Sequence, residues 1–462
     1  MTKELRLPAE VPRNYREIVE WLAEEIGAGR LVAGERLPTH RNLAHLLGIA
    51  VATVSRAYGE LARRGYVRGE VGRGSFVRRQ SDRPAPQAIT ERSQERIDLS
   101  INQPASGESH SEALSHAFVE LSGDSSLARH FEYSPSVGSH RHRVAGATWA
   151  RRHGLEVSPD RLIVCNGTQH AISIALRSVA RPGETVLTES VTNPSMKALA
   201  RFLGVRLVGL PLDDEGIRLD SLAPACRQPG VKALYCIPDL QNPTGIVMSA
   251  QRRQEVAKCA SDNDVAIVEN GLFSPFMPKP MPPIASLGIG RVHFICGFSK
   301  TVSAGLRIAY LATPDGGDAL LSGAIYATTT MACPLMAELA RRWVEDGTAE
   351  RLVAWQREEI TERRALARRI LGMSDEPKAR RACPHFWYPI PEPLRAEDVV
   401  AAAFRRNLLI TSAEPFLIGR TSDPFAIRLG LGAARSQAEL RSALMTLRDI
   451  LNGEPEMAAP ML

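Results

Sequence analysis

The sequence has few cysteines, and none of them belongs to a recognisable metal or disulfide motif. Seven are scattered along 462 residues, an odd number without any CxxC spacing. This pattern argues against a disulfide framework or a zinc site and favours reduced thiols in a cytoplasm. Long apolar runs are also missing: none reaches the roughly 18 residues of a membrane helix, and no apolar signal region follows Met1. We therefore expect a cytoplasmic protein.

What the chain does have is an uneven charge. Its net charge is +6, and residues 1–79 carry five of these six charges, with 14 Lys and Arg against nine Asp and Glu. Between residues 41 and 79 the ratio sharpens to eight against two. A local basic excess is typical of a surface that binds a polyanion, although a solvated helix face would look the same. The length predicts two or three domains.

The first eighty residues have the pattern of a helix-turn-helix. Apolar residues recur at helical spacing over 15–28 and again over 52–64. Between these stretches, Thr39 is placed to cap a short helix over 41–47, and Gly48 can end that helix with a tight turn. Two short helices joined in this way match a DNA-binding unit whose second helix contacts the bases.

Two short β-prone runs follow at 66–68 and 75–77, with a glycine-rich segment between them. They predict a β-ribbon wing, and Arg73 at its tip could enter a minor groove. The alternative is a small helical subdomain with a hairpin and no part in DNA binding.

The string from 35 to 77 resembles the winged helix of GntR-type regulators. The resemblance implies binding of double-stranded operator DNA through a set of hydroxylic, basic and glycine residues: Thr39, Arg41, Thr53, Ser55, Arg56, Gly72, Arg73 and Gly74. Arg41 and Arg56 are the best candidates, because a guanidinium group grips a phosphate or a guanine edge with two hydrogen bonds. The run 49–52 is Ile-Ala-Val-Ala, where such proteins usually carry a polar or basic residue.

A linker and a large domain follow the predicted DNA-binding domain at 1–78. Residues 79–96 are polar, charged and proline-bearing, as in a flexible tether. Residues 97–462 alternate helical stretches with strand-like apolar runs, which lie at 162–165, 185–188, 207–210, 233–237, 265–268, 293–296 and 308–312. This alternation predicts a mostly parallel sheet covered on both faces, with ligands bound beyond the carboxyl ends of its strands.

Three motifs come directly after these strands. Gly167-Thr168 opens a helix whose N-terminal amides suit a phosphate. Asn242 begins an Asn-Pro-Thr-Gly sequence, and Ser299-Lys300 is followed seven residues later by Arg307. Each motif alone is weak, but their order along one α/β pattern is specific.

Together these motifs resemble fold-type I aminotransferases, and the two halves of the chain resemble MocR-type regulators. The implied fold is an α+β winged helix-turn-helix followed by a large α/β aminotransferase-like domain with a smaller C-terminal α+β part. The implied cofactor is pyridoxal 5'-phosphate (PLP), with Lys300 forming the internal aldimine and Asn242 hydrogen-bonding the ring oxygen. The residues that would hold the PLP phosphate are small, hydroxylic or basic: Gly167, Thr168, Ser299 and Arg307.

The resemblance also implies a second subunit and a small-molecule effector. Tyr133 would reach the PLP phosphate of the neighbouring subunit in a homodimer. Arg428 matches the arginine that clamps the carboxylate of an amino acid, a task suited to a planar guanidinium.

The sequence departs from the aminotransferase pattern around the PLP ring. Asn270 (or Gly271, if shifted by one) stands where the family has an aspartate beside the pyridine nitrogen. Phe273 replaces a tyrosine, and Asn193 replaces the aromatic residue that stacks on the ring. Without the aspartate, the carbanion of transamination loses a close counter-charge, which should cost on the order of a thousandfold in rate. Exchange of Lys300 for an amine ligand needs no such counter-charge.

We interpret the chain as a PLP-dependent transcription regulator that senses a small amine or amino-acid-like effector. Two alternatives stay open from the residues alone. One is a working aminotransferase with an accessory DNA domain. The other is a regulator whose effector domain binds PLP loosely or no longer binds it.

Overall fold

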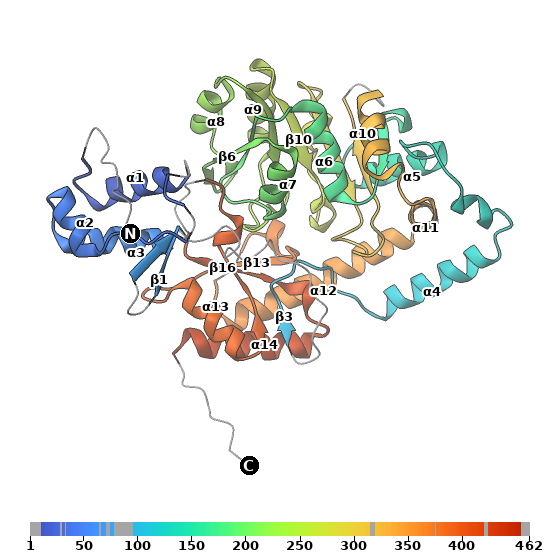
Figure 1. Ribbon diagram of the computed structural model, residues 1–462. Coiled ribbons are helices and arrows are strands. Elements are labelled where there is room, and N and C mark those ends of the chain that lie inside the picture. Colours follow the sequence, from blue (N-terminus) through green and yellow to red (C-terminus); the bar gives the residue numbers. More distant parts are fainter. Residues whose placement is uncertain are drawn as a thin grey trace, which may run out of the picture. The chain divides into compact units, whose positions relative to one another are not determined.

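The computed structural model describes residues 11–27, 30–32, 34–63, 66–70, 74–77, 96–314, 319–374, 376–419 and 424–453. Two compact units, Met1–Ile89 and Thr90–Leu462, divide within the range predicted as a linker. The linker itself lies outside the described residues up to position 95, and so do Gly72 and Arg73 of the predicted wing tip. Figure 1 shows the ribbon of both units.

The N-terminal unit is a three-helix bundle followed by a β-hairpin. Its elements are α1 (Tyr15–Gly27), α2 (His40–Leu47), α3 (Val51–Arg63), β1 (Val67–Glu70) and β2 (Gly74–Val77), with β1 antiparallel to β2. The predicted cap is confirmed, because the Thr39 hydroxyl accepts from the backbone N–H of Asn42 at 3.2 Å. Gly48 ends α2 in the left-handed conformation at φ +65°. Val54 and Leu61 of α3 are fully buried in the core between the helices.

The large unit is built on a seven-stranded sheet with the order β4-β12-β11-β10-β9-β5-β6. Its strands are β4 (Leu162–Cys165), β5 (Thr185–Glu189), β6 (Arg206–Leu210), β9 (Val231–Cys236), β10 (Ala266–Asn270), β11 (Val292–Gly297) and β12 (Ala309–Ala312). All seven predicted strands are confirmed, with ends shifted by two residues at most. The sheet is parallel except for β12, which is antiparallel to both of its neighbours.

Helices cover both faces of this sheet, as the alternation of apolar runs predicted. Ile163 of β4 packs in one core with α6 (Thr168–Val179). Its neighbour Leu162 faces the other way, into a core with α5 (His140–Arg152) and α11 (Pro334–Glu345), because successive strand residues point to opposite faces. The other elements around the sheet are α4 (Glu108–Ser122), α7 (Ser195–Leu203), α8 (Leu219–Cys226), α9 (Ala250–Asp262), α10 (Ala319–Thr329), β7 (Leu212–Asp213) and β8 (Gly216–Ile217).

A smaller α+β part completes the large unit, as predicted. The long helix α12 (Thr348–Ile370) precedes it. An antiparallel sheet of order β13-β16-β15 packs with two further helices: β13 (His385–Pro389), β15 (Thr411–Ser412), β16 (Ala426–Gly430), α13 (Ala396–Arg405) and α14 (Gln437–Leu451). The first strand of the large unit, β3 (Ile97–Asp98), pairs in parallel with β14 (Leu408–Leu409). Among the described residues, no single helix is both long and apolar enough to cross a membrane, and α10 and α11 reach that composition only as a pair bent by 119°.

Candidate functional site

Lys300 lies in the turn after β11, at the carboxyl end of the parallel strands, and is half-buried. Its Nζ donates to the backbone carbonyl of Asn102 at 2.5 Å. Burial, helped by the positive charges of Arg428 and Arg307, lowers the pKa of this amine from 10.5 to about 8. A useful share of the amine is therefore neutral near physiological pH, as a nucleophilic lysine requires.

The groups predicted to hold a phosphate converge at the start of α6. Gly167 caps this helix with φ +82°, and a Cβ at that position would lie 2.5 Å from Nη2 of Arg307. The guanidinium therefore needs a glycine beside it. Arg307 also donates through Nη1 to the Ser299 hydroxyl at 3.4 Å. The buried Thr168 hydroxyl has no hydrogen-bond partner among the described residues. A guanidinium, hydroxyls and a helix N-terminus together suit an anion.

Asn242 lies in the loop after β9, at the same edge of the sheet. It is buried, and its Oδ1 has no partner within the described chain. Gln241 fixes the loop, because its Nε2 donates to the Val191 carbonyl at 2.7 Å and its Oε1 accepts from the Thr244 hydroxyl at 2.7 Å. The loop that carries Asn242 is thus held in place, and the amide oxygen of Asn242 stays unpaired among the described residues.

Asn270 is the last residue of β10, and its amide is held at both ends. Its Oδ1 accepts from the Leu272 backbone N–H at 3.2 Å, and its Nδ2 donates to the Tyr235 hydroxyl at 2.9 Å. The Leu272 N–H can only donate, so it fixes which end of the amide is oxygen. Glu269 points to the opposite face, as alternation predicted, and accepts from the backbone N–H groups of Ile284 and Ala285.

The other two departures from the aminotransferase pattern also lack the expected group. Phe273 is buried with its ring edge-on to His385, at 5.2 Å between centroids. Asn193 uses its Oδ1 to accept from the Ser195 backbone N–H at 3.3 Å. Phe273 therefore has no hydroxyl to offer to a bound cofactor, and Asn193 has no ring to stack on it.

Arg428 on β16 is buried, yet only one of its three nitrogens is paired within the part of the chain that the structure describes. Nη2 donates to the Ser100 carbonyl at 2.7 Å, whereas Nε and Nη1 have no partner among the described residues. The guanidinium lies over the Phe416 ring, 5.3 Å from its centroid. Burial lowers its pKa to about 10, so the group keeps its charge near neutral pH. N–H donors of a buried cation that have no partner among the described residues are suited to a carboxylate.

Tyr133 lies at the surface of the single subunit. Its side chain is 88% exposed, and the neighbouring Phe131 is 74% exposed. Its predicted role toward the phosphate of a second subunit stays a prediction.

The predicted DNA-binding residues divide into two groups. The first group makes hydrogen bonds within the N-terminal unit. The Thr39 side chain caps α2, and the Ser55 hydroxyl lies 3.0 Å from Nδ1 of His40, at hydrogen-bond distance.

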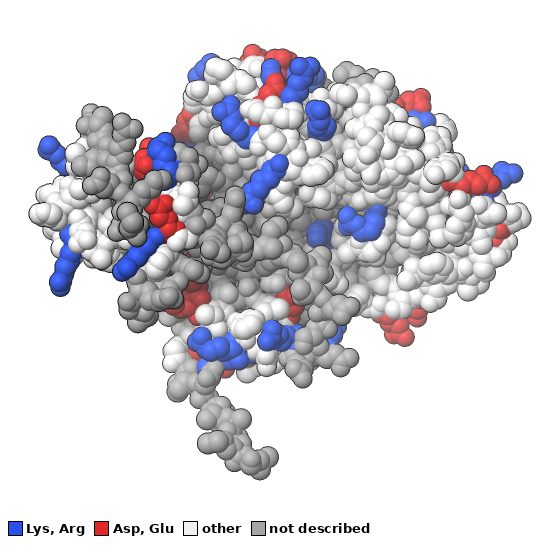
Figure 2. All heavy atoms as spheres, in the orientation of Figure 1, with Lys and Arg blue, Asp and Glu red and all other residues white. Residues whose placement is uncertain are grey.

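The second group is accessible at the surface. Arg41 and Arg56 are exposed, and the Arg56 guanidinium lies 4.0 Å from the centroid of the Tyr15 ring. Figure 2 shows such basic side chains at the surface of the N-terminal unit. Thr53 is half-buried, and Gly74 begins β2 with φ +111°. Their contacts with DNA stay predictions.

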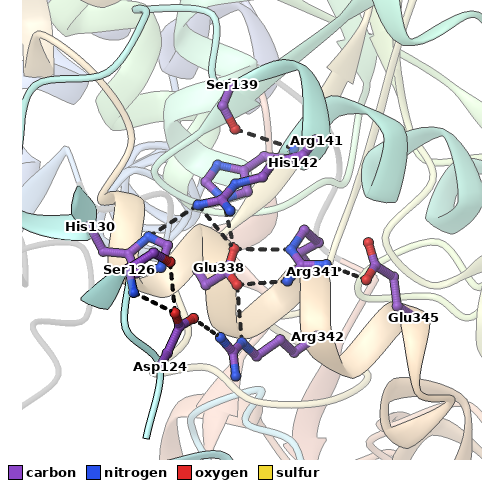
Figure 3. Close-up of polar contacts among 10 residues, drawn as sticks. All are labelled: Asp124, Ser126, His130, Ser139, Arg141, His142, Glu338, Arg341, Arg342 and Glu345. Atoms are coloured by element: carbon purple, nitrogen blue, oxygen red, sulfur yellow. Dashed lines mark hydrogen bonds and ion pairs between the residues drawn. The ribbon is translucent and has the colours of Figure 1, made fainter. Parts of the chain in front are cut away.

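Figure 3 shows a second polar cluster, formed by residues of α5, α11 and the segment between α4 and α5. Asp124, His130 and Glu338 bring their ligand atoms within 4.8 Å of one another, as in a metal site. The Glu338 carboxylate, however, already accepts from Arg341 at 2.7 Å, and also from Arg342 and His142. Burial opposes its ionisation, but these hydrogen bonds outweigh burial and hold its pKa well below the ordinary value. We therefore interpret the cluster as an ion-pair network that joins α5 to α11.

Sequence reasoning missed three residues of the pocket: Asn102, Tyr235 and His385. The strand pattern held a signal for Tyr235, because Val268 is its partner on β10 and Asn270 lies on the same face two residues later. Asn102 and His385 come from distant parts of the chain, and no local motif marks them.

Comparisons with known proteins give the family matches of the two units. Residues 94–447 match the family model described as aminotransferase class I and II, and residues 14–77 match that of bacterial regulatory proteins of the gntR family. The chain is 28% identical to an uncharacterized HTH-type transcriptional regulator, YdeF of Bacillus subtilis, over 95% of this chain and 94% of YdeF. It is 29% identical to a probable rhizopine catabolism regulatory protein, MocR of Rhizobium meliloti, over 66% of each chain. A Pyrococcus horikoshii kynurenine aminotransferase shares the fold, with a TM-score of 0.70 and 21% identity over 79% of this chain and 92% of that one.

Proposed function

Because this chain belongs to the class I and II aminotransferase family and carries a gntR-type domain, we propose that it is a PLP-dependent transcription regulator of the MocR type. It binds operator DNA through residues 1–78 and senses a carboxylate-bearing amine through residues 97–462. It acts as a cytoplasmic homodimer. The full-length similarity to YdeF supports this combination, because the similarity spans both units.

The residues of the pocket fit PLP, the cofactor that the aminotransferase fold implies. Thr168, Ser299 and Arg307 would hold the phosphate at the N-terminus of α6, where the Thr168 hydroxyl has no partner among the described residues. Asn242 would bind the ring oxygen through its amide. When bound, PLP supplies an aldehyde that links reversibly to an amine. Lys300 provides that amine, and its lowered pKa keeps part of it neutral.

The single observation that carries the sensing role is the contrast between Arg428 and Asn270. Arg428 is buried and keeps two nitrogens, Nε and Nη1, without a partner among the described residues, which suits a ligand carboxylate. Asn270 has its oxygen occupied by Leu272 and can offer at most an N–H toward a pyridine nitrogen. An N–H donor favours the unprotonated ring, which is a poor electron sink for a carbanion. The pocket is thus suited to bind and exchange amines and unsuited to transaminate them.

The exposed aromatic residues support the homodimer. Phe131 and Tyr133 expose large rings on one short stretch of the surface. Exposed apolar groups of this kind favour a subunit interface. Burial there would bring Tyr133 toward the second subunit.

The test is a gel-shift titration with a duplex from the region upstream of the encoding gene, together with borohydride trapping of the cofactor. We expect the purified protein to bind this duplex, to trap PLP on Lys300, and to change its affinity for DNA when PLP is removed. A protein that traps PLP on Lys300 but binds the upstream duplex no better than unrelated DNA would contradict the regulatory function.

A further inference from the structure

The segment that follows β3 lies directly against the end of β16. The Gly430 N–H donates to the Leu99 carbonyl at 2.7 Å. A Cβ on Gly430 would lie 1.9 Å from the Ile101 carbonyl oxygen, and one on Gly432 would lie 2.2 Å from that of Gln103. These two glycines therefore allow an approach that other residues would block. The backbone around position 102 is fixed by this contact.

This contact places Asn102 between the two groups that would hold an effector. Its backbone carbonyl accepts from Nζ of Lys300 at 2.5 Å. Two residues earlier, the Ser100 carbonyl accepts from Nη2 of Arg428 at 2.7 Å. A ligand whose amine lies near Lys300 and whose carboxylate binds Arg428 would therefore lie beside Asn102.

His385 fixes the orientation of the Asn102 amide. Nε2 of His385 lies 2.9 Å from the Gln241 carbonyl, which can only accept, so this nitrogen carries the proton. Burial lowers the pKa of His385 to about 3, so its ring is neutral and Nδ1 is an acceptor. Nδ1 lies 3.3 Å from Nδ2 of Asn102, which supplies the matching donor. The Oδ1 of Asn102 must then point away from His385.

That oxygen is an acceptor for which the described residues supply no donor. Asn102 is only 7% exposed, and its Oδ1 has no hydrogen-bond partner among the described residues. An unpaired buried acceptor is costly, which favours a ligand that supplies the missing donor. We propose that Asn102 determines effector specificity, by selecting carboxylate-bearing amines that carry an additional N–H or O–H donor beside their amine.

This inference rests on the proposed function, because it assumes that Lys300 and Arg428 bind the two ends of the effector. It adds that the pocket discriminates within that class. A ligand with only hydrogens at the corresponding carbon leaves Oδ1 unpaired, whereas a hydroxyl or amine there donates to it. Sites that hydrogen-bond a ligand hydroxyl discriminate strongly against analogues that lack it.

The experiment compares ligand pairs that differ by one hydroxyl. Binding of L-serine against L-alanine, and of isoserine against β-alanine, is measured by titration calorimetry on the full-length protein loaded with PLP. In at least one pair the hydroxylated ligand should bind roughly tenfold tighter or more. Asn102→Leu should bring that ratio to about one. In Asn102→Asp a carboxylate oxygen replaces the Nδ2 donor beside Nδ1 of His385, so His385 must take up a proton to pair with it. The second oxygen keeps the acceptor for the ligand, so this variant should retain the preference even where the leucine variant fails to fold.

Two results would overturn the inference while leaving the proposed function intact. One is tight binding of both members of each pair with a ratio near one in the wild type. The other is an unchanged preference in a folded Asn102→Leu protein. Failure of all four ligands to bind would overturn the proposed effector site itself, and the specificity of Asn102 with it.

Discussion

The two ends of the pocket differ in whether their polar groups are already satisfied. At the phosphate and carboxylate end, Thr168 and Arg428 are buried with polar atoms that have no partner among the described residues. At the ring-nitrogen end, Asn270 is hydrogen-bonded to Tyr235 and Leu272. An unpaired buried group costs about 1–3 kcal/mol, so the first end is built to be completed by a ligand. The second end is complete without one.

The difference separates binding from catalysis. Cofactor anchoring and carboxylate recognition need donors and a neutral lysine, and these remain. Carbanion stabilisation needs a carboxylate beside the pyridine nitrogen, and the nearest acidic residue on β10, Glu269, is occupied on the other face by Ile284 and Ala285. A domain that keeps the binding groups but lacks the carboxylate beside the pyridine nitrogen can report the presence of an amine without consuming it.

The largest expected effect concerns Lys300. Lys300→Ala should abolish the borohydride-trapped adduct completely, because it removes the only amine that we assign to the cofactor. Mass spectrometry of the trapped peptides measures this loss. The exposed Lys279→Ala serves as a matched control and should keep the adduct. Trapping at Lys197, Lys232 or Lys279 in the wild-type protein would show that the assignment is wrong.

Arg428→Gln should weaken binding of a carboxylate-bearing amine by about 2–5 kcal/mol, because it removes the buried cation that pairs with the carboxylate. Titration of the PLP-loaded protein with L-alanine measures the change. Ethylamine, which lacks the carboxylate, is the control ligand and should bind both proteins equally. An equal loss for both ligands would mean that the variant disturbs the pocket in general.

Arg56→Ala should weaken operator binding by about 1–3 kcal/mol if the guanidinium contacts a base, with reduced discrimination between operator and unrelated DNA. If Arg56 holds a phosphate, the loss should be similar on all sequences. Arg30→Ala is a suitable control, because Arg30 is exposed and paired with Glu25 at 2.8 Å. Unchanged affinity of the Arg56 variant in a gel-shift titration would remove this residue from the interface.

The pH dependence of cofactor attachment gives a smaller effect. Burial and two neighbouring cations lower the pKa of Lys300 to about 8, and only the neutral amine attacks an aldehyde. The attachment rate should therefore rise with pH through about 8 and level off above it. Arg428→Gln removes one of the cations, so it should move the inflection to higher pH. Rapid mixing of apoprotein with PLP at a series of pH values checks both statements, and an inflection near that of an ordinary lysine would contradict them.

Local patterns predicted the fold well, and they predicted the site in part. The strands could be located because both faces of the sheet are buried, and the ligand edge followed from their carboxyl ends. The motifs at Gly167, Asn242 and Lys300 are contiguous, so the sequence displays them directly. Asn102 and His385 could not be predicted, since their meeting depends on the packing of the segment after β3 against β16. The unpaired nitrogens of Arg428 likewise become evident only from the structure, in which Ser100 is its one hydrogen-bond partner among the described residues.

The central claim is that the ring-nitrogen end, not the rest of the pocket, prevents transamination. The most direct test is to measure keto-acid formation from L-alanine by PLP-loaded wild-type protein and by Asn270→Asp. The Leu272 N–H and the Tyr235 hydroxyl can both donate to a carboxylate at position 270, so the variant should be accommodated. We predict negligible product from the wild type and a clear gain, up to on the order of a thousandfold, from the variant. Robust turnover by the wild type, or no gain from a variant that binds PLP, would contradict this account.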